Sequence, residues 1–148
     1  MSTNLPRCAV IGAGSSGITA VKGLRDAGLE VTAFEASDRI GGNWVFDNSN
    51  GMSAAYEGLH INTSRERMEY RDFPMPKSYP DFPHHTHIAA YFESYVDHFG
   101  LRPHIRFRTR VERAERGREG GWTLTLGDGS TERFDALLVA NGHHWDPQ

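Results

Sequence analysis

Apolar runs and glycine-rich breaks at the start of the chain follow the order of a β-α-β unit. Residues 7–11 form a short, mostly apolar run that predicts a buried parallel strand. Residues 18–25 place apolar side chains at helical spacing, and Gly28 is well placed to end this helix. Residues 29–34 return to a strand pattern. The start of the chain therefore predicts a strand, a helix and a second strand.

A second helix and several short strands are predicted further along. Residues 86–99 carry an apolar stripe at helical spacing, with Thr86 as the expected cap and Gly100 at the end. Short alternating segments follow at residues 104–107, 110–115, 122–126 and 131–134. Because Gly-Gly and Asp-Gly turns separate the last three, we expect them to form an antiparallel meander. An apolar run at 135–140 predicts a further buried strand.

The middle of the chain lacks any such periodicity. Residues 47–58 are rich in Asn, Ser, Gly and Ala, which predicts a loop. The mid-chain prolines fall within residues 68–85, where they exclude a regular helix or a central strand. A long irregular segment inside a compact domain usually has a function or a surface to pack on.

The glycine triplet after the first strand predicts a dinucleotide-binding turn. Gly12 would make the tight turn, Gly14 would leave room for a pyrophosphate, and Gly17 would let the helix pack closely on the strand. The free amides at the helix start would face the anion, which the helix dipole also favours. Glu35 follows about twenty residues later. Its carboxylate can accept hydrogen bonds from both ribose hydroxyls and would repel a 2′-phosphate. The alternative is a glycine-rich turn without a ligand.

The residues after Glu35 favour FAD over NAD. They include Arg39, Gly41, Gly42 and Trp44, for which a plain NAD-binding domain has no need. The pattern E-x-x-x-x-x-G-G resembles flavoprotein oxidoreductases with two dinucleotide domains, in which the paired glycines pass close to the FAD. We therefore expect FAD as the cofactor.

Four further motifs resemble the flavin-containing monooxygenase family. They are Asn62-Thr63-Ser64, Tyr70-Arg71-Asp72-Phe73-Pro74-Met75-Pro76, Pro80-Asp81-Phe82-Pro83 and Ala140-Asn141-Gly142-His143. Together they span nearly the whole chain in the family's order, although the family usually has threonine where this chain has Asn141. Baeyer-Villiger monooxygenases share the glycine motif but usually continue with an arginine-rich tyrosine-proline segment. This chain has Val45-Phe46-Asp47-Asn48 there, which favours the amine- and sulfur-oxidising branch.

The resemblance implies an α/β fold: a Rossmann-like FAD-binding domain with a central parallel sheet and a small antiparallel β-meander. The cofactor-binding residues that it implies are Gly12, Gly14, Ser15, Ser16, Gly17, Glu35, Ala36, Arg39, Gly42, Asn43, Trp44, Asn62, Thr63, Val111, Ala140, Asn141 and Gly142. Asn62 takes the place of the family's active-site asparagine, whose side chain can hold a flavin hydroperoxide or a nicotinamide amide in register. Without the resemblance, Asn62 is typical of a turn residue that bonds its own backbone.

The resemblance also implies a reaction for the complete enzyme. NADPH reduces the flavin, dioxygen adds to give a C4a-hydroperoxide, and an amine or sulfide takes the distal oxygen. Because residues 1–148 hold one phosphate-binding motif, we expect a single FAD-binding domain that stops before the NADPH-binding domain. Such a portion would not complete the cycle alone, and uncovered surfaces around the prolines would drive it to form homo-oligomers. The alternatives are a non-catalytic FAD- or ADP-binding module and an NAD(P)-dependent dehydrogenase domain.

Composition narrows the classes of partner. A formal net charge of -3 and the lack of a dense basic run argue against nucleic acid. No apolar run approaches transmembrane length and no signal pattern is present, so we expect a cytoplasmic protein without a membrane partner. The eight histidines lack acidic or thiol partners at metal-site spacing, which predicts no metal site. Cys8, the single cysteine, lies within the first predicted strand and is interpreted as a core residue.

Overall fold

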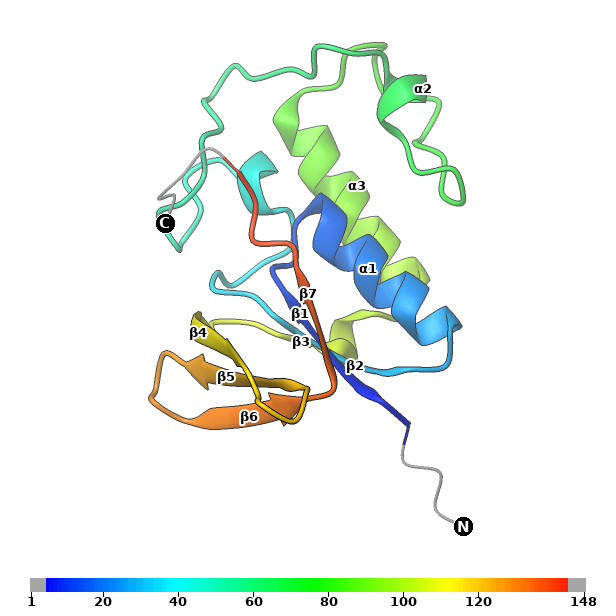
Figure 1. The fold of residues 1–148 in the computed structure, drawn as a ribbon. Coiled ribbons are helices and arrows are strands. Elements are labelled where there is room, and N and C mark those ends of the chain that lie inside the picture. The colour runs from blue at the N-terminus through cyan, green and yellow to red at the C-terminus, as the bar shows by residue number, and fades with distance from the viewer. Residues whose placement is uncertain (1–4, 144–148) are drawn as a thin grey trace.

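A four-stranded parallel sheet forms the centre of the computed structural model, which describes residues 5–143 (Figure 1). Its strands are β1 (Arg7–Ile11), β2 (Glu30–Phe34), β3 (Ile105–Arg106) and β7 (Ala136–Val139), in the order β3-β2-β1-β7. In the β1 register, Cys8 lies between Val31 of β2 and Ala136 of β7, and its side chain is buried. The predicted central parallel sheet is therefore confirmed.

The apolar strand predicted at 135–140 is present as β7, but it is not buried. Val139 is 60% exposed, and its neighbours are at most half-buried. The physical reason is its position, since β7 pairs with β1 on one side and forms the edge of the sheet among the described residues.

Two long helices cover one face of the parallel sheet and pack against each other (Figure 1). They are α1 (Ser15–Asp26) and α3 (His85–His98), and the short elements are η1 (Gly42–Trp44), α2 (Arg65–Met68) and η2 (Arg102–His104). As predicted, α1 ends just before Gly28, which has a φ of 79° that favours glycine.

The predicted cap of α3 is wrong. Thr86 lies inside the helix, and the cap is His84, whose Nδ1 accepts a hydrogen bond from the Thr86 amide at 3.3 Å. His84 has an extended backbone, which places its ring nitrogen where the side-chain oxygen of Ser, Thr, Asp or Asn usually lies. An imidazole nitrogen therefore replaces the expected hydroxyl.

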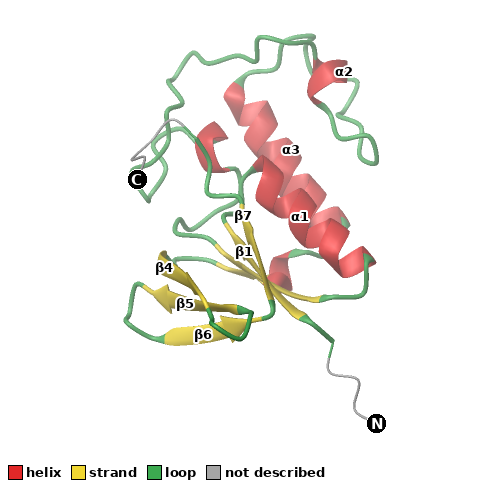
Figure 2. Ribbon diagram, viewed as in Figure 1, coloured by secondary structure: helices red, strands yellow, loops and turns green. Residues whose placement is uncertain are grey.

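The predicted meander is also confirmed, as a separate antiparallel sheet (Figure 2). It consists of β4 (Val111–Arg116), β5 (Trp122–Leu126) and β6 (Thr131–Phe134), with a register shift between Val111 and Arg113. Its inner face buries Leu124 and Leu126 in a small core, which also includes Phe34 from the parallel sheet. The meander is thereby fixed beside the carboxyl end of β2.

The proline-rich segment, residues 68–83, packs on the two helices. Tyr70 lies against α3, with ring centroids 5.8 Å from Phe92 and 4.7 Å from Tyr95, and Met75 is buried. The irregular segment therefore does have a surface to pack on, and that surface is the aromatic face of α3.

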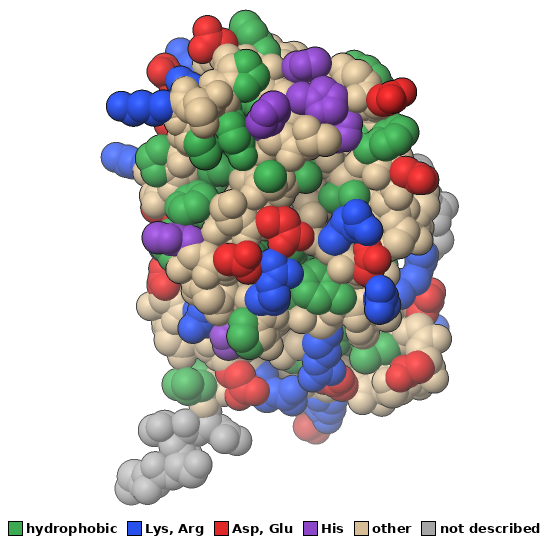
Figure 3. All heavy atoms as spheres, turned by 180° about the vertical axis from the view of Figure 1, so that it is seen from behind, with side chains coloured by type: hydrophobic (Ala, Val, Ile, Leu, Met, Phe, Trp, Pro, Cys, Tyr) green, Lys and Arg blue, Asp and Glu red, His purple; other side chains and the backbone are tan. Residues whose placement is uncertain are grey.

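The back of the molecule carries charges of both signs. Figure 3 shows acidic and basic side chains interspersed over this face and histidines gathered at one end of it. Within residues 5–143, no helix combines the length and hydropathy needed to cross a bilayer. The same residues contain no group of three His, Cys, Asp or Glu side chains arranged to hold a metal ion.

Candidate functional site

A cavity of about 620 Å³ opens where the carboxyl ends of β1, β2 and β7 meet the start of β4. Open α/β sheets bind ligands outside the carboxyl ends of their strands, and small-molecule sites commonly measure about 300–1,000 Å³. The predicted cofactor-binding residues that line it are Gly12, Gly14, Ser15, Ser16, Glu35, Ala36, Gly42, Asn43, Trp44, Val111, Ala140, Asn141 and Gly142. The fold thus gathers at one place residues that are far apart in the sequence.

Two of the glycines in the turn are required by packing. A Cβ on Gly12 would lie 2.4 Å from the Ala140 carbonyl oxygen, and Gly12 also has a φ of 100°. A Cβ on Gly17 would lie 1.9 Å from the Gly12 carbonyl oxygen. Side chains at these positions would separate α1 from β1 and β7, so Gly17 affects the site through the packing of α1 without lining the cavity.

Gly14 differs, because its missing side chain leaves space in the cavity itself. A Cβ there would lie 3.6 Å from the Gly42 Cα, which is ordinary van der Waals contact, and its backbone is not in the left-handed region. Gly14 and Gly42 both line the cavity, where their close approach brings two loops together. A side chain at Gly14 would therefore occupy ligand space without disturbing the packing of the fold.

The first turn of α1 offers amide donors to the cavity. The first helical hydrogen bond runs from the Ile18 amide to the Gly14 carbonyl oxygen at 3.1 Å, and no side chain caps the helix. The amides of Ser15, Ser16 and Gly17 have no hydrogen-bond acceptor among residues 5–143. Free amides at the positive end of a helix dipole favour an anionic group.

The Glu35 side chain joins the glycine turn to the loop after β2. Its Oε2 accepts a hydrogen bond from the Ala13 amide and its Oε1 accepts one from the Ser37 amide, both at 2.8 Å. The residue is 5% exposed and lines the cavity. Because each carboxylate oxygen has a second lone pair, Glu35 can still accept a hydrogen bond from a ligand hydroxyl.

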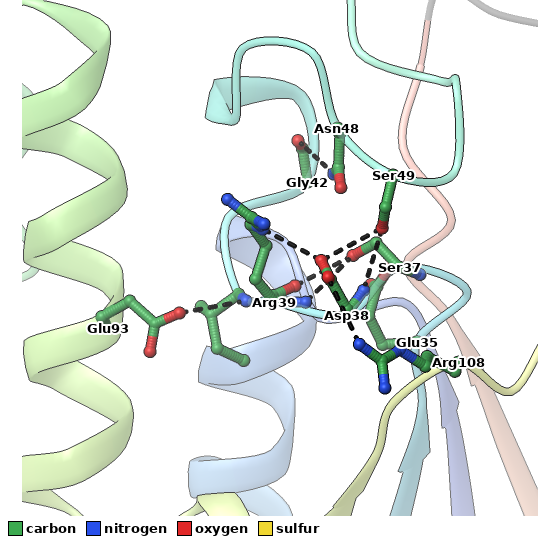
Figure 4. Close-up of polar contacts among 10 residues, drawn as sticks. Glu35, Ser37, Asp38, Arg39, Gly42, Asn48, Ser49, Glu93 and Arg108 are labelled. Atoms are coloured by element: carbon green, nitrogen blue, oxygen red, sulfur yellow. Dashed lines mark hydrogen bonds and ion pairs between the residues drawn. The ribbon is translucent and has the colours of Figure 1, made fainter.

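Arg39 does not line the cavity and instead pairs with Asp38 (Figure 4). Asp38 Oδ1 accepts hydrogen bonds from Arg39 Nε at 2.9 Å and from Ser49 Oγ at 3.0 Å, while Arg108 Nη2 lies 3.6 Å from Asp38 Oδ2. The hydrogen bonds from Arg39 and then Ser49 lower the pKa of Asp38 to about 2. Asp38 thus ties three loops together beside the cavity, and the cofactor role of Arg39 stays a prediction.

Asn62 and Thr63 also lie outside the cavity lining. Both side chains are exposed, in the loop before α2. The structure does not bring Asn62 together with the glycine turn, so its predicted catalytic role stays a prediction.

Other residues that line the cavity were not predicted from the sequence. They are Ile11, Phe34, Asn50, Met52, Thr109, Arg110, Glu112, Arg113, Ala114, Val139 and His143, whereas Gly41 also lines the cavity, as the paired-glycine pattern predicted. Residues 109–114 are held beside the end of β2, because the Thr109 amide donates a hydrogen bond to the Glu35 carbonyl oxygen at 2.9 Å. The register of β4 also shifts within this range, between Val111 and Arg113. No local motif marks either feature, although the ends of the first two predicted strands could have suggested Ile11 and Phe34.

The sequence is similar to flavin-dependent oxygenases along nearly all of its length. A model of the flavin-binding monooxygenase-like family matches residues 6–148. Flavin-containing monooxygenase 5 of Rattus norvegicus is 39% identical over 150 residues, covering 95% of this chain and 28% of that protein. Dimethylaniline monooxygenase [N-oxide-forming] 2 of the same species is 37% identical over 150 residues, with the same coverage. The chain spans about 28% of the length of these curated relatives.

Solved structures of oxygenases share the fold. S-allyl-L-cysteine S-oxygenase from Allium sativum superimposes with a TM-score of 0.87 and 30% identity, over 98% of this chain and 38% of that one. A steroid monooxygenase bound to NADP gives a TM-score of 0.81 and 31% identity, over 95% of this chain and 26% of that one. OTEMO, solved in complex with FAD and NADP, gives a TM-score of 0.79 and 25% identity, over 93% of this chain and 25% of that one.

Proposed function

The chain belongs to the flavin-binding monooxygenase-like family and forms a portion of a flavoprotein monooxygenase, and we propose that this portion binds the ADP half of FAD in the cavity. One observation carries the proposal. The space left by Gly14 lies at the N-terminus of α1. The amides of Ser15, Ser16 and Gly17 in that first turn have no acceptor among the described residues. A diphosphate needs both close access to the backbone and several amide donors.

The surrounding residues fit the rest of an adenosine diphosphate group. Glu35 has free lone pairs for the ribose hydroxyls, and its negative charge disfavours a 2′-phosphate. The Gly42–Trp44 turn and the start of β4 both line the cavity, where an adenine or flavin portion would lie. When bound, FAD supplies the redox chemistry that activates dioxygen, and these residues bind and orient it.

For the whole protein, we propose NADPH-dependent oxygenation of soft nucleophiles such as amines and sulfides. Two relatives support the substrate class, since one is named for forming N-oxides and another for S-oxygenation. We assign NADPH binding to the part of the protein outside this portion, because the described glycine turn is already matched to FAD. The portion alone then acts as an FAD-binding module without turnover.

The substitution Gly14→Ala tests the proposed site. Its methyl group would fill ligand space and lie in ordinary contact with Gly42. We expect at least ~tenfold weaker FAD binding, equivalent to ~1.4 kcal/mol, measured by titrating the flavin absorbance and fluorescence. Thermal unfolding should show a loss of no more than ~1 kcal/mol, since Gly14 is the α1 cap residue.

Gly23→Ala is the matched control. Gly23 lies within α1, and no atom lies within 4 Å of the position of an added Cβ, so FAD binding should match that of the parent chain. Equal FAD affinity of the Gly14→Ala and parent chains would overturn the site. Competition by NAD as effective as that by ADP and FAD would favour the dehydrogenase alternative.

A further inference from the structure

A tyrosine from the proline-rich segment bonds the backbone of the first turn of α1. The Tyr70 hydroxyl donates a hydrogen bond to the Ser15 carbonyl oxygen at 2.7 Å, across a sequence separation of 55 residues. The Thr19 hydroxyl donates to the same oxygen at 3.1 Å from within the helix. The Ser15 carbonyl thus has a local partner on its own helix and a distant partner from another part of the chain.

Tyr70 is held firmly enough to direct this contact. Its amide donates a hydrogen bond to the Tyr91 hydroxyl at 2.7 Å, and its ring packs against Tyr91, Phe92 and Tyr95 of α3. Burial raises the pKa of the Tyr70 hydroxyl, so it keeps its proton and remains a donor. Because several contacts restrain the ring, the hydroxyl is positioned before any ligand arrives.

The Ser15 carbonyl and the Ser16 amide belong to one peptide group. A trans peptide is planar, so its C=O and N–H point in opposite directions, and a tilt of one tilts the other. In a helix the carbonyl points toward the C-terminus, so the Ser16 N–H points back toward the glycine turn. Ser16 lines the cavity, and its amide has no acceptor among the described residues. A hydrogen bond to the carbonyl also polarises the peptide, which makes the N–H a stronger donor.

We propose that Tyr70 is a positioning residue for the dinucleotide diphosphate, acting through the Ser15–Ser16 peptide. The inference rests on the proposed FAD site and extends it to the proline-rich segment. Since the segment reaches the amide through one hydroxyl, docking of the segment and binding of the diphosphate are coupled, and the coupling is reciprocal. Lys22 of α1 strengthens the link, because its Nζ lies 3.1 Å from Asp72 Oδ2 of the segment.

The substitution Tyr70→Phe tests the contact in the ligand-free chain. It removes the hydroxyl and keeps the ring. We expect the NMR signals of the Ser15 carbonyl carbon and the Ser16 amide to shift. Tyr95→Phe is the matched control, since it removes a hydroxyl from the same aromatic cluster and no hydrogen bond joins Tyr95 to the described part of α1. Unchanged Ser15 and Ser16 signals in Tyr70→Phe would overturn the inference.

FAD binding is the second measurement. Loss of one neutral hydrogen bond is worth ~0.5–1.5 kcal/mol, so we expect FAD to bind ~twofold to tenfold more weakly to Tyr70→Phe. Tyr95→Phe should bind FAD as the parent chain does. FAD should also slow hydrogen exchange at the Tyr70 amide in the parent chain, and should slow it less in Tyr70→Phe.

The outcomes separate this inference from the proposed function. Equal FAD affinity in Tyr70→Phe and the parent chain would overturn the inference while leaving the FAD site intact. A parent chain that binds no FAD would overturn the proposed function and, with it, any role of Tyr70 toward a diphosphate. Weakened FAD binding together with shifted Ser15 and Ser16 signals, in Tyr70→Phe alone, would support both.

Discussion

The glycine-rich turn, residues 12–17, runs into the first turn of α1, and the proline-rich segment, residues 68–83, contacts that turn, but the two regions are held in opposite ways. The turn depends on the absence of side chains, because a Cβ on Gly12 or Gly17 would collide with backbone atoms. The segment depends on side-chain contacts, chiefly the hydroxyls of Tyr70 and Tyr91. Backbone atoms cannot move aside for an added side chain without shifting a helix or strand, whereas a hydroxyl hydrogen bond can be lost while the fold stays intact. The two regions should therefore differ sharply in their tolerance to substitution.

The largest effect is expected from Gly17→Ala. The added Cβ would lie 1.9 Å from the Gly12 carbonyl oxygen, so α1 must move away from β1. Overpacking of this kind costs ~3 kcal/mol, and chemical denaturation should show that loss. Gly23→Ala in the same helix meets no atom within 4 Å and should gain ~0.5 kcal/mol instead. Similar stabilities for the two variants would break the comparison.

A smaller and more local effect is expected from Tyr91→Phe. The Tyr91 hydroxyl accepts a hydrogen bond from the Tyr70 amide and donates one to the Phe73 carbonyl oxygen. Leaving these two backbone groups unpaired should cost ~2 kcal/mol. Hydrogen exchange should accelerate in residues 70–75 and remain slow in β1.

The exposed Tyr56 provides the control for that experiment. It is 62% exposed, so Tyr56→Phe should leave stability and exchange unchanged. Faster exchange in β1 than in the proline-rich segment of Tyr91→Phe would contradict the expected local effect.

The smallest effect is expected for Asp38, whose side chain makes polar contacts in the loop after β2, near the glycine-rich turn. Its folded pKa of about 2 lies below its ordinary value of 3.8. The stabilisation is therefore fully present above pH 3.8 and is lost as the pH falls toward 2. Because Asp38 pairs with exposed partners, solvent screening keeps the effect small. Asp38→Asn should reduce the loss of folding stability between pH 3.8 and 2, measured by chemical denaturation at several pH values. An unchanged loss would show that the contacts of Asp38 do not stabilise the fold.

The predicted elements that proved correct are those with a local steric or periodic cause. Gly28 ends α1 with a positive φ, and the Gly-Gly and Asp-Gly turns delimit the meander. The glycine turn and Glu35 could be predicted because their spacing reflects a backbone requirement. The same applies to the β-α-β unit at the start of the chain, since β1 and β2 flank a single helix and pair with each other.

The features that could not be predicted depend on contacts between distant residues. The Tyr70 contact joins positions 55 residues apart, and no local pattern distinguishes that hydroxyl from the one on Tyr95. The cap of α3 is a histidine, which propensity rules do not rank as a cap. Arg110 lines the cavity next to the backbone pairing of Thr109 with Glu35, which joins distant positions and arises only in the folded chain.

The position of Cys8 makes its thiol a probe of how often the central sheet opens. This thiol is the single cysteine of the chain, is 3% exposed, and lies on β1 between β2 and β7. Burial raises its pKa, which suppresses the reactive thiolate in the closed state. A thiol reagent therefore reacts with Cys8 mainly in molecules whose central sheet has separated. Each labelling event then records one such opening, and the labelling rate counts how often the centre of the sheet comes apart.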